Sequence, residues 1–391
     1  MAERFDPFRT LSSVGWNVGG DGRILVQGTF TNWGGAAATR QAWHDPDTGW
    51  FFPPDPHPAG AVAAMAIYNG FLHAVAGGMT LYRYNAGSNT WTNIAQVFDG
   101  ILASSMIVHN GILYIGRVET TSVASFLYSW DGVTLAAIAN PTAAVIKARA
   151  LISIPGGDLC VLCGHNPSLQ VIGRFYRYNG AVLTEQLNAT IVSGVTGTAG
   201  QGYTCGVLVG NELICGGDSQ DLNMVANVGG LSLRSPVMRI DLSTNTVLNY
   251  SPTDGTLRYG LAGKVFAITP NHVAGNFYGK YLIGEILEDG SVNGLHNVAK
   301  LNGAGNDYSA LASGVRNSGS VSLATVRAMV EDGSDVIVAG QQIDQAPGFT
   351  IPKNYATFRS ATWQDAHAPS GSGAPSDNIT LLYTKDATPL S

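Results

Sequence analysis

One phrase recurs along this chain and constrains its fold more than any other feature: an apolar run, a short turn, a second apolar run and then a glycine. It is visible in the segments AMAIYNGFLHAVAGG, SMIVHNGILYIGR, ISIPGGDLCVLCGH, GVLVGNELICGGD and RAMVEDGSDVIVAGQ. Asn-Gly and Asp-Gly between apolar runs are strong β-hairpin signals, because both central residues of a type I′ turn need a positive φ angle. The glycines that close the second run are Gly28, Gly77, Gly116, Gly164, Gly216, Gly284 and Gly340.

Each unit also has a second half, in which an apolar and aromatic strand ends in Asp or Asn before a turn and another strand. The residues before this turn are Asp45, Asn85, Asp131, Asn179, Asp241 and Asn302, and the seventh unit, NYATFRSATW, lacks such a residue. Asp and Asn suit the position because their side chains hydrogen-bond to the backbone of the turn. The closing glycines lie 39 to 68 residues apart, with a mean of 52, close to the roughly 40–50 residues of a four-stranded propeller blade.

These repeats predict an all-β fold, a seven-bladed β-propeller of four-stranded antiparallel blades. The propeller is expected over residues 1–368, with blades near 12–56, 62–97, 102–139, 149–188, 203–250, 260–312 and 322–366. Residues 369–391 are expected to form a Gly/Ser/Pro linker and a C-terminal strand that closes the ring or joins a partner. Closure by FDPFRTL near the N-terminus is the alternative. Small residues are needed where the innermost strands crowd together, which accounts for much of the glycine, 49 of 391 residues.

Composition excludes several classes of function. Charged residues make up only 12% of the chain, the net charge is −6 and no basic run occurs, so we expect no nucleic-acid binding through phosphate neutralisation. The N-terminal residues lack the pattern of a signal peptide, and no apolar stretch of about 18 residues predicts a transmembrane helix or membrane insertion.

The four cysteines are Cys160, Cys163, Cys205 and Cys215. Cys160 and Cys163 fall three residues apart in an expected strand, so their side chains point to opposite faces and cannot hold one zinc ion. Small, buried, apolar roles are therefore expected for these residues. A disulfide between Cys205 and Cys215 across a hairpin remains open at this point.

Residue patterns that would indicate catalysis are missing from the sequence. The eight histidines are scattered over different repeats, and no HExxH, GxSxG, Walker A or Cys/His cluster is present. His73 and His109 fall in or beside core strands and are expected to be structural. The acidic segments HDPDTG and EDGSD read as turns between strands. We therefore predict no enzyme activity, no catalytic residue, no metal and no cofactor.

Two units, GRILVQGTFTNWGGAAATRQAWHDPDTGW and GKYLIGEILEDGSVNGLHNVAKLNGAGNDYSALASGV, resemble repeats of Kelch-like and delta-60-type bacterial propeller proteins. The resemblance covers about residues 12–363 and implies the fold but no activity, because the Gly-Gly pair typical of Kelch blades is present only at Gly77-Gly78 and Gly216-Gly217. In composition the chain is also similar to bacteriophage virion proteins, with few charges, few Lys and much Gly, Ala, Ser, Thr and Asn. That similarity implies localisation in a virion if the chain is encoded by a phage.

Long loops between the second and third strands of the units share one face of a propeller, and binding sites concentrate on such loops. The binding residues predicted there are Trp33, Arg117, His165, Asp218, Met224 and Phe349. We expect a non-catalytic structural or interaction propeller that binds other protein subunits, most sharply a phage tail or capsid-associated protein. The alternatives are a propeller that recognises a carbohydrate or host surface, with Trp33 and Phe349 stacking on sugar rings, and a polysaccharide lyase or glycosidase. The identity of the partner, the stoichiometry and glycan binding are left open.

Overall fold

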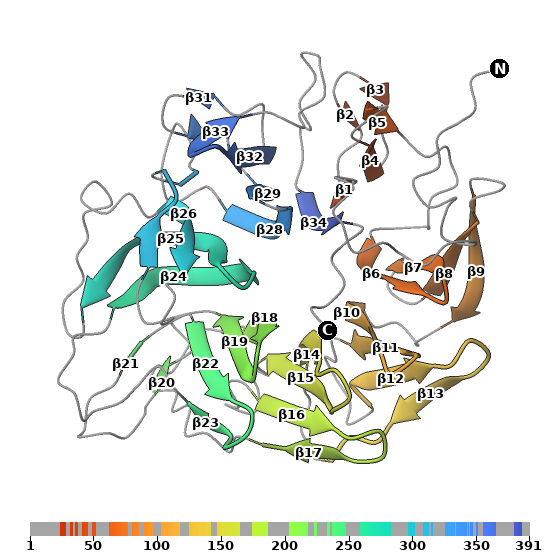
Figure 1. Ribbon diagram of the computed structural model, residues 1–391. Coiled ribbons are helices and arrows are strands. Elements are labelled where there is room, and N and C mark those ends of the chain that lie inside the picture. The colour runs from red at the N-terminus through yellow and green to blue at the C-terminus, as the bar shows by residue number, and fades with distance from the viewer. Residues whose placement is uncertain are drawn as a thin grey trace, which may run out of the picture.

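The structure is a computed structural model. It describes residues 24–28, 32–33, 36–37, 41–45, 49–51, 62–76, 80–85, 90–96, 103–117, 125–141, 147–164, 174–186, 203–217, 223–224, 233–234, 237–247, 259–282, 296–301, 308–312, 314–315, 325–332, 334–341, 343, 345–346, 349–350, 355–364 and 379–384. Within these residues the structure consists of β-strands and the turns between them, with no helix. The strands described there form seven four-stranded antiparallel sheets and three two-stranded ribbons (Figure 1). The all-β prediction is confirmed.

The sheets are numbered in chain order and their strands from the centre outward. Sheet 1 contains β34 (Ile379–Thr384), β1 (Ile24–Gly28), β4 (Gln41–Asp45) and β5 (Gly49–Phe51). Sheet 2 contains β6 (Val62–Tyr68), β7 (Phe71–Ala76), β8 (Thr80–Asn85) and β9 (Thr90–Gln96). Sheet 3 contains β10 (Ala103–His109), β11 (Ile112–Arg117), β12 (Leu127–Trp130) and β13 (Leu135–Ile138). Sheet 4 contains β14 (Lys147–Ser153), β15 (Leu159–Gly164), β16 (Arg174–Tyr178) and β17 (Leu183–Glu185).

The remaining sheets follow the same plan. Sheet 5 contains β18 (Tyr203–Val209), β19 (Glu212–Gly217), β22 (Val237–Asp241) and β23 (Thr246–Val247). Sheet 6 contains β24 (Tyr259–Ile268), β25 (His272–Leu282), β26 (His296–Leu301) and β27 (Tyr308–Ala310). Sheet 7 contains β28 (Thr325–Asp332), β29 (Asp335–Gln341), β32 (Tyr355–Arg359) and β33 (Thr362–Gln364). β14 and β24 begin slightly before the expected blade starts at 149 and 260.

The sheets follow one another around a common centre, with their first strands innermost (Figure 1). We call β34, β6, β10, β14, β18, β24 and β28 the inner strands. Contacts join these strands in series, from β6 through β10, β14, β18, β24 and β28 to β34. This arrangement is consistent with a propeller-like fold.

The hydrophobic core lies between the faces of successive sheets. One buried cluster joins sheets 2 and 3, and others join sheets 3 and 4, 4 and 5, 5 and 6, and 6 and 7. At the interface of sheets 4 and 5, for example, Leu162 and Phe175 pack with Leu213 and Ile240, and all four are fully buried. Sheets 3 to 6 thus bury both of their apolar faces, because a neighbouring sheet covers each one.

The turns have the local geometry that their residues predict. Asn69 and Gly70, and likewise Asn110 and Gly111, have positive φ angles at the tips of their hairpins. The Oδ1 atom of Asp131 accepts hydrogen bonds from the backbone N–H groups of Val133 and Thr134, at 2.8 and 2.7 Å. Asn179 and Asp241 cap their turns in the same way.

The C-terminal strand, and not the N-terminal segment, fills the inner position of sheet 1. β34 pairs antiparallel with β1, with Val26 opposite Leu382, while β1 pairs on its other side with β4. Of the two alternatives, the structure therefore supports the one in which the C-terminal strand completes a sheet within this chain. The N-terminal segment FDPFRTL lies outside the described residues.

Candidate functional site

Three of the predicted binding residues lie on small ribbons at the same end of their sheets. The ribbons pair β2 (Asn32–Trp33) with β3 (Ala36–Ala37), β20 (Asn223–Met224) with β21 (Leu233–Arg234), and β30 (Gln345–Ala346) with β31 (Phe349–Thr350). Each ribbon belongs to the connection between the second and third strands of its sheet. We call this end of the sheets the loop end, and the end with the short hairpin turns the turn end. Trp33, Met224 and Phe349 are thus brought to one side of the molecule.

Of the other three predicted binding residues, the structure describes Arg117. Arg117 is only 5% exposed, and its Nη1 donates to the carbonyl of Ser125 and to the hydroxyl of Tyr128. It therefore anchors the base of its own loop from within and does not present an exposed contact. His165 and Asp218 lie outside the described residues.

A β-bulge distinguishes the inner strands near the loop end, and sequence reasoning did not find it. In each inner strand from β6 to β28 at least one residue is skipped in the pairing with the second strand. The residues skipped singly are Ala63, Ser104, Arg149, Thr204, Phe266 and Arg327. A bulge redirects a side chain out of the regular alternation of a strand, and bulges often lie next to functional sites.

Two of the bulged residues join neighbouring inner strands. The hydroxyl of Ser104 donates to the carbonyl of Ala148, and the hydroxyl of Thr204 donates to the carbonyl of Val265. Each bond crosses from one sheet to the next. These small polar bulges therefore hold the inner strands together.

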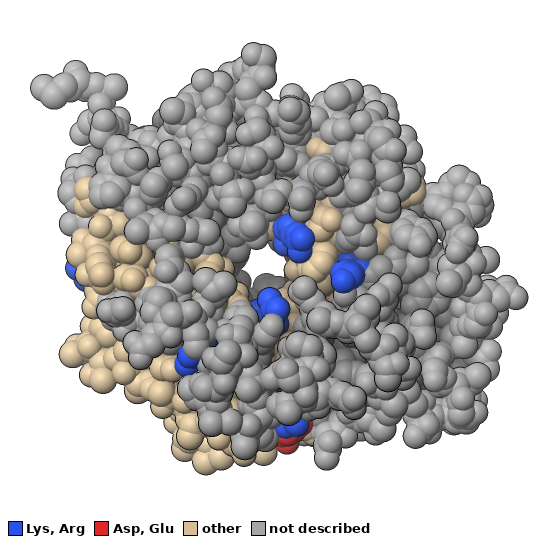
Figure 2. Space-filling model, turned by 180° about the vertical axis from the view of Figure 1, so that it is seen from behind, with Lys and Arg blue, Asp and Glu red and all other residues tan. Residues whose placement is uncertain are grey.

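The other polar bulges are cationic. Arg149 and Arg327 are bulged residues of β14 and β28, and Lys264 lies on β24 between them in chain order. Figure 2 shows Lys and Arg side chains around the central opening, with no acidic side chain visible beside it among the residues described. The sequence signal is a basic residue within an inner strand otherwise rich in Ala, Gly and Val, as in KARAL, LAGKV and TVRAM.

Arg149 is half-buried and Arg327 is exposed, and neither has an acidic partner among the described residues. Burial lowers the pKa of Arg149 and of Arg327, and no acidic group counteracts it among the described residues. The Nε atom of Arg149 is buried and has no hydrogen-bond partner there. The guanidinium of Arg327 lies over the ring of Phe266, 4.5 Å from its centroid. A half-buried cation without a counter-charge is costly, so the position of Arg149 is not explained by a gain in stability.

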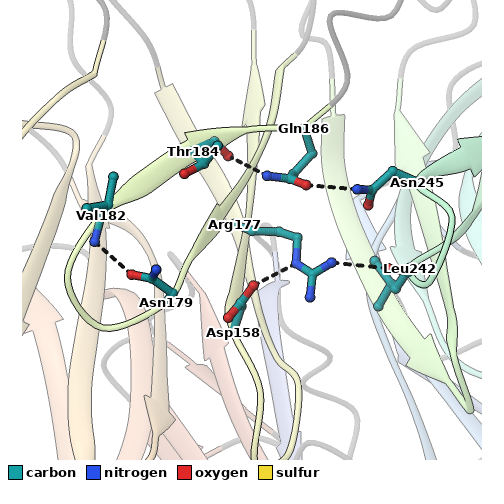
Figure 3. A network of polar contacts seen from close by, with 8 residues as sticks. All are labelled: Asp158, Arg177, Asn179, Val182, Thr184, Gln186, Leu242 and Asn245. Carbon is teal, nitrogen blue, oxygen red and sulfur yellow. Dashed lines mark hydrogen bonds and ion pairs between the residues drawn. The ribbon is translucent and has the colours of Figure 1, made fainter.

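At the turn end, in contrast, charged side chains have hydrogen-bond partners. Arg177 of β16 donates from Nε to Asp158 at 2.8 Å and from Nη1 to the carbonyl of Leu242 in sheet 5 at 3.1 Å (Figure 3). Asn245 of the same turn donates to Gln186. The network ties sheets 4 and 5 together and leaves little for a ligand to bind.

A second hydrogen-bonded network, centred on Glu331, joins sheets 6 and 7. Glu331 accepts hydrogen bonds from His272 Nδ1 at 2.7 Å, from Asn271 Nδ2 at 2.9 Å and from the hydroxyl of Thr269. Burial alone would raise the pKa of Glu331, but these hydrogen bonds outweigh it and lower the pKa to about 2. The EDGSD segment is a hairpin turn, as predicted, in which Asp332 pairs with Asp335.

The cysteines and core histidines have structural surroundings. Cys160 belongs to the cluster between sheets 4 and 5 and Cys163 to the cluster between sheets 3 and 4, so they point to opposite faces as predicted. Cys205 pairs with Gly216 and Cys215 with Gly206. Because Cys205 and Gly206 are adjacent in β18, Cys205 and Cys215 also face opposite ways, and both are free thiols.

His73 and His109 are 3% and 4% exposed, as expected for structural residues. Burial lowers the pKa of His73 to about 4, and His73 Nδ1 hydrogen-bonds to the carbonyl of Phe71 at 2.9 Å. No group of three or more His, Cys, Asp or Glu side chains suited to a metal ion occurs in the described part of the chain. That part also contains no helix long and apolar enough to span a membrane.

Comparison with known proteins gives no family. No protein-family model matches the chain, and no curated protein matches it. Among solved structures, it is similar to the crystal structure of the computationally designed Ika8 protein, with 11% sequence identity, 76% of each chain covered and a TM-score of 0.43. A likeness of this size carries no argument about function.

Proposed function

We propose that this protein is a non-catalytic interaction protein, built as a closed seven-bladed β-propeller of the Kelch-like type. Its loop end binds other protein subunits of a larger assembly. The observation that supports this proposal is the set of three ribbons, β2–β3, β20–β21 and β30–β31, which extend from one end of a rigid array of sheets. Binding sites are commonly carried by such loops on a rigid scaffold.

The sharpest form of the proposal is a component of a phage virion, as a tail or capsid-associated protein. Its support is compositional: 12% charged residues, six Lys and 49 Gly in 391 residues. Permanent interfaces are more apolar than transient ones, so a chain with few charges suits lasting assembly. Recognition of a surface carbohydrate is the alternative, in which Trp33 and Phe349 stack on sugar rings.

The test compares the two ends of the sheets. Trp33→Ser, Met224→Ser and Phe349→Ser are combined in one variant of the loop end. The matched control carries Val133→Ser and Val182→Ser, because these apolar side chains are 84% and 58% exposed in turns at the opposite end. We expect cross-linked partner proteins from the native particle or cell to be lost from the ribbon variant and retained by the valine variant.

The opposite pattern, or equal loss from both variants, would refute the loop end as the binding surface. A glycan array then separates the two kinds of partner. Binding that disappears in Trp33→Ala would replace the protein partner by a carbohydrate, and turnover of any polysaccharide would refute the non-catalytic assignment.

A further inference from the structure

Along the central opening, the acidic residues of the described inner strands lie apart from the basic ones. Among the described inner-strand residues, the carboxylates are Glu331 and Asp332, both at the turn end of β28. Arg327, near the other end of β28, precedes Glu331 by four residues, which corresponds to about 13 Å along an extended strand. Glu331 is already engaged by His272. The acidic residues of the described inner strands are therefore not placed to pair with Arg149 or Arg327.

Three sheets contribute these cations. Arg149 comes from β14 in sheet 4, Lys264 from β24 in sheet 6 and Arg327 from β28 in sheet 7. The inner strands surround one opening (Figure 1), and Lys and Arg side chains lie around it (Figure 2), so residues of separate sheets border the same space. A single group within the opening can then be reached from several sides.

The surroundings of the two arginines point to a bound negative charge. Arg149 has a buried Nε–H without a partner in the described part of the chain, and buried donors are normally satisfied. Arg327 has one face of its guanidinium on Phe266, and a stacked guanidinium still presents N–H groups along its edge. Carboxylate and phosphate oxygens match this planar donor arrangement.

We propose that the loop-end mouth of the central opening is a binding site for a small multivalent oxyanion, one that carries carboxylate or phosphate groups. Arg149 and Arg327 donate charge-assisted hydrogen bonds to it, and Lys264 contributes a third positive charge. The site is separate from the ribbons and does not depend on the identity of the partner proposed above.

The experiment is isothermal titration of the purified full chain with inorganic phosphate and with citrate, at constant pH and with ionic strength held constant by sodium chloride. We expect saturable binding of at least one of the two probes. The preferred probe distinguishes a phosphate site from a carboxylate site. Affinity for that probe should fall when the ionic strength is raised, because the interaction is electrostatic.

The variants are Arg327→Gln and Arg149→Gln, with Arg83→Gln as the matched control. Arg83 is also exposed and also lies over a phenylalanine ring, 4.9 Å from the centroid of Phe71, but it belongs to β8 and not to an inner strand. We expect each inner-strand variant to bind the probe about tenfold more weakly or worse, and Arg83→Gln to bind like the unmodified chain.

Thermal unfolding followed by circular dichroism checks that each variant is folded. Arg327 is exposed, so its replacement is the safer test if Arg149→Gln unfolds. The proposal is overturned if neither probe binds, if Arg327→Gln binds as well as the unmodified chain, or if Arg83→Gln loses as much affinity as Arg327→Gln.

Discussion

The guanidinium of Arg327 lies over the ring of Phe266, and both residues are bulges on neighbouring inner strands. The second bulge supplies an aromatic surface on which the cation is held. The two irregularities thus act together, because the bulge of β24 places Phe266 in contact with the guanidinium of Arg327.

Replacement of an unpaired cation should not weaken the fold, whereas replacement of a paired one should. Arg149→Gln removes a desolvated charge without a described counter-charge, so we expect the free energy of unfolding to stay within about 0.5 kcal/mol or to rise. Arg177→Gln breaks the bonds to Asp158 and Leu242 and should lower it by about 1–3 kcal/mol. Urea denaturation at pH 7 measures both. A large loss of stability in Arg149→Gln would assign that residue a structural role.

The junction of sheets 6 and 7 should weaken in acid. The pKa of Glu331 is lowered from its ordinary value near 4.5 to about 2, so its stabilisation is complete above pH 4.5 and is lost as the pH falls toward 2. At most about 3 kcal/mol is involved. Glu331→Gln should lower stability at pH 7 and reduce its pH dependence between pH 4.5 and 2, as measured by urea denaturation.

The control for Glu331 is Asp131→Asn. The Asp131 carboxylate is exposed, and among the partners described it bonds only to its own turn. Its replacement should therefore change little the loss of stability between pH 4.5 and 2. An Asp131 variant as acid-insensitive as the Glu331 variant would contradict the assignment of the effect to the sheet junction.

Two of the closing glycines should differ in their tolerance of a side chain. A Cβ atom at Gly216 would meet Cys205 Sγ and Val265 Cγ1, each at 2.6 Å, and these are side-chain atoms that can shift. At Gly340 it would meet the backbone carbonyl of Thr325, which cannot. We expect Gly216→Ala to lower the free energy of unfolding by about 1–3 kcal/mol and Gly340→Ala to lower it further.

A double variant tests this steric explanation. Adding Cys205→Ala to Gly216→Ala removes one of the two obstacles, so the combined loss should be smaller than the sum of the single losses. Strict additivity would show that crowding by Cys205 is not the cause.

Removal of the C-terminal strand should open sheet 1. A chain that ends at residue 378 leaves the β1 edge that pairs with β34 without a partner, and exposed edges favour aggregation. We expect backbone amides of residues 24–28 to lose protection in hydrogen exchange. A chain that ends at residue 384 keeps β34 and should retain protection; equal protection in both chains would contradict the closure.

The thiols should be inert in the folded protein. Burial raises the pKa of Cys160 and Cys205 to about 12 and raises that of Cys163 and Cys215 well above its usual value. Because the thiolate is the reactive form, we expect little labelling by Ellman's reagent at pH 8 and labelling of all four cysteines in urea. Cys205 should react first, because it alone among the four is not fully buried. Rapid labelling of Cys163 in the native state would contradict the burial.

Local chemistry explains why so much of the fold could be predicted. The hairpins at Asn69-Gly70 and Asn110-Gly111, and the capped turn at Asp131, depend on residues within a few positions of one another. The opposite orientations of Cys160 and Cys163 also follow from strand geometry alone. Such features are visible in a sequence because no distant partner decides them.

The features that sequence reasoning missed depend on distant partners. The bulges at Arg149 and Arg327 arise from the register between strands. Closure by the C-terminal strand was one of two predicted alternatives, and the pairing of β34 with β1, which joins opposite ends of the chain, decided between them. Arg117 was expected on an exposed loop, but its contacts with Ser125 and Tyr128 bury it. Whether a loop folds back on its own base is decided by packing, which a pattern of residue types does not record.

The pairing of β34 with β1 has a consequence for biosynthesis. Residues 24–28 leave the ribosome long before residues 379–384, so the innermost position of sheet 1 must stay vacant throughout elongation. The nascent protein therefore exposes an incomplete sheet until translation has passed residue 384, a period in which a chaperone or a neighbouring nascent chain has access to that edge.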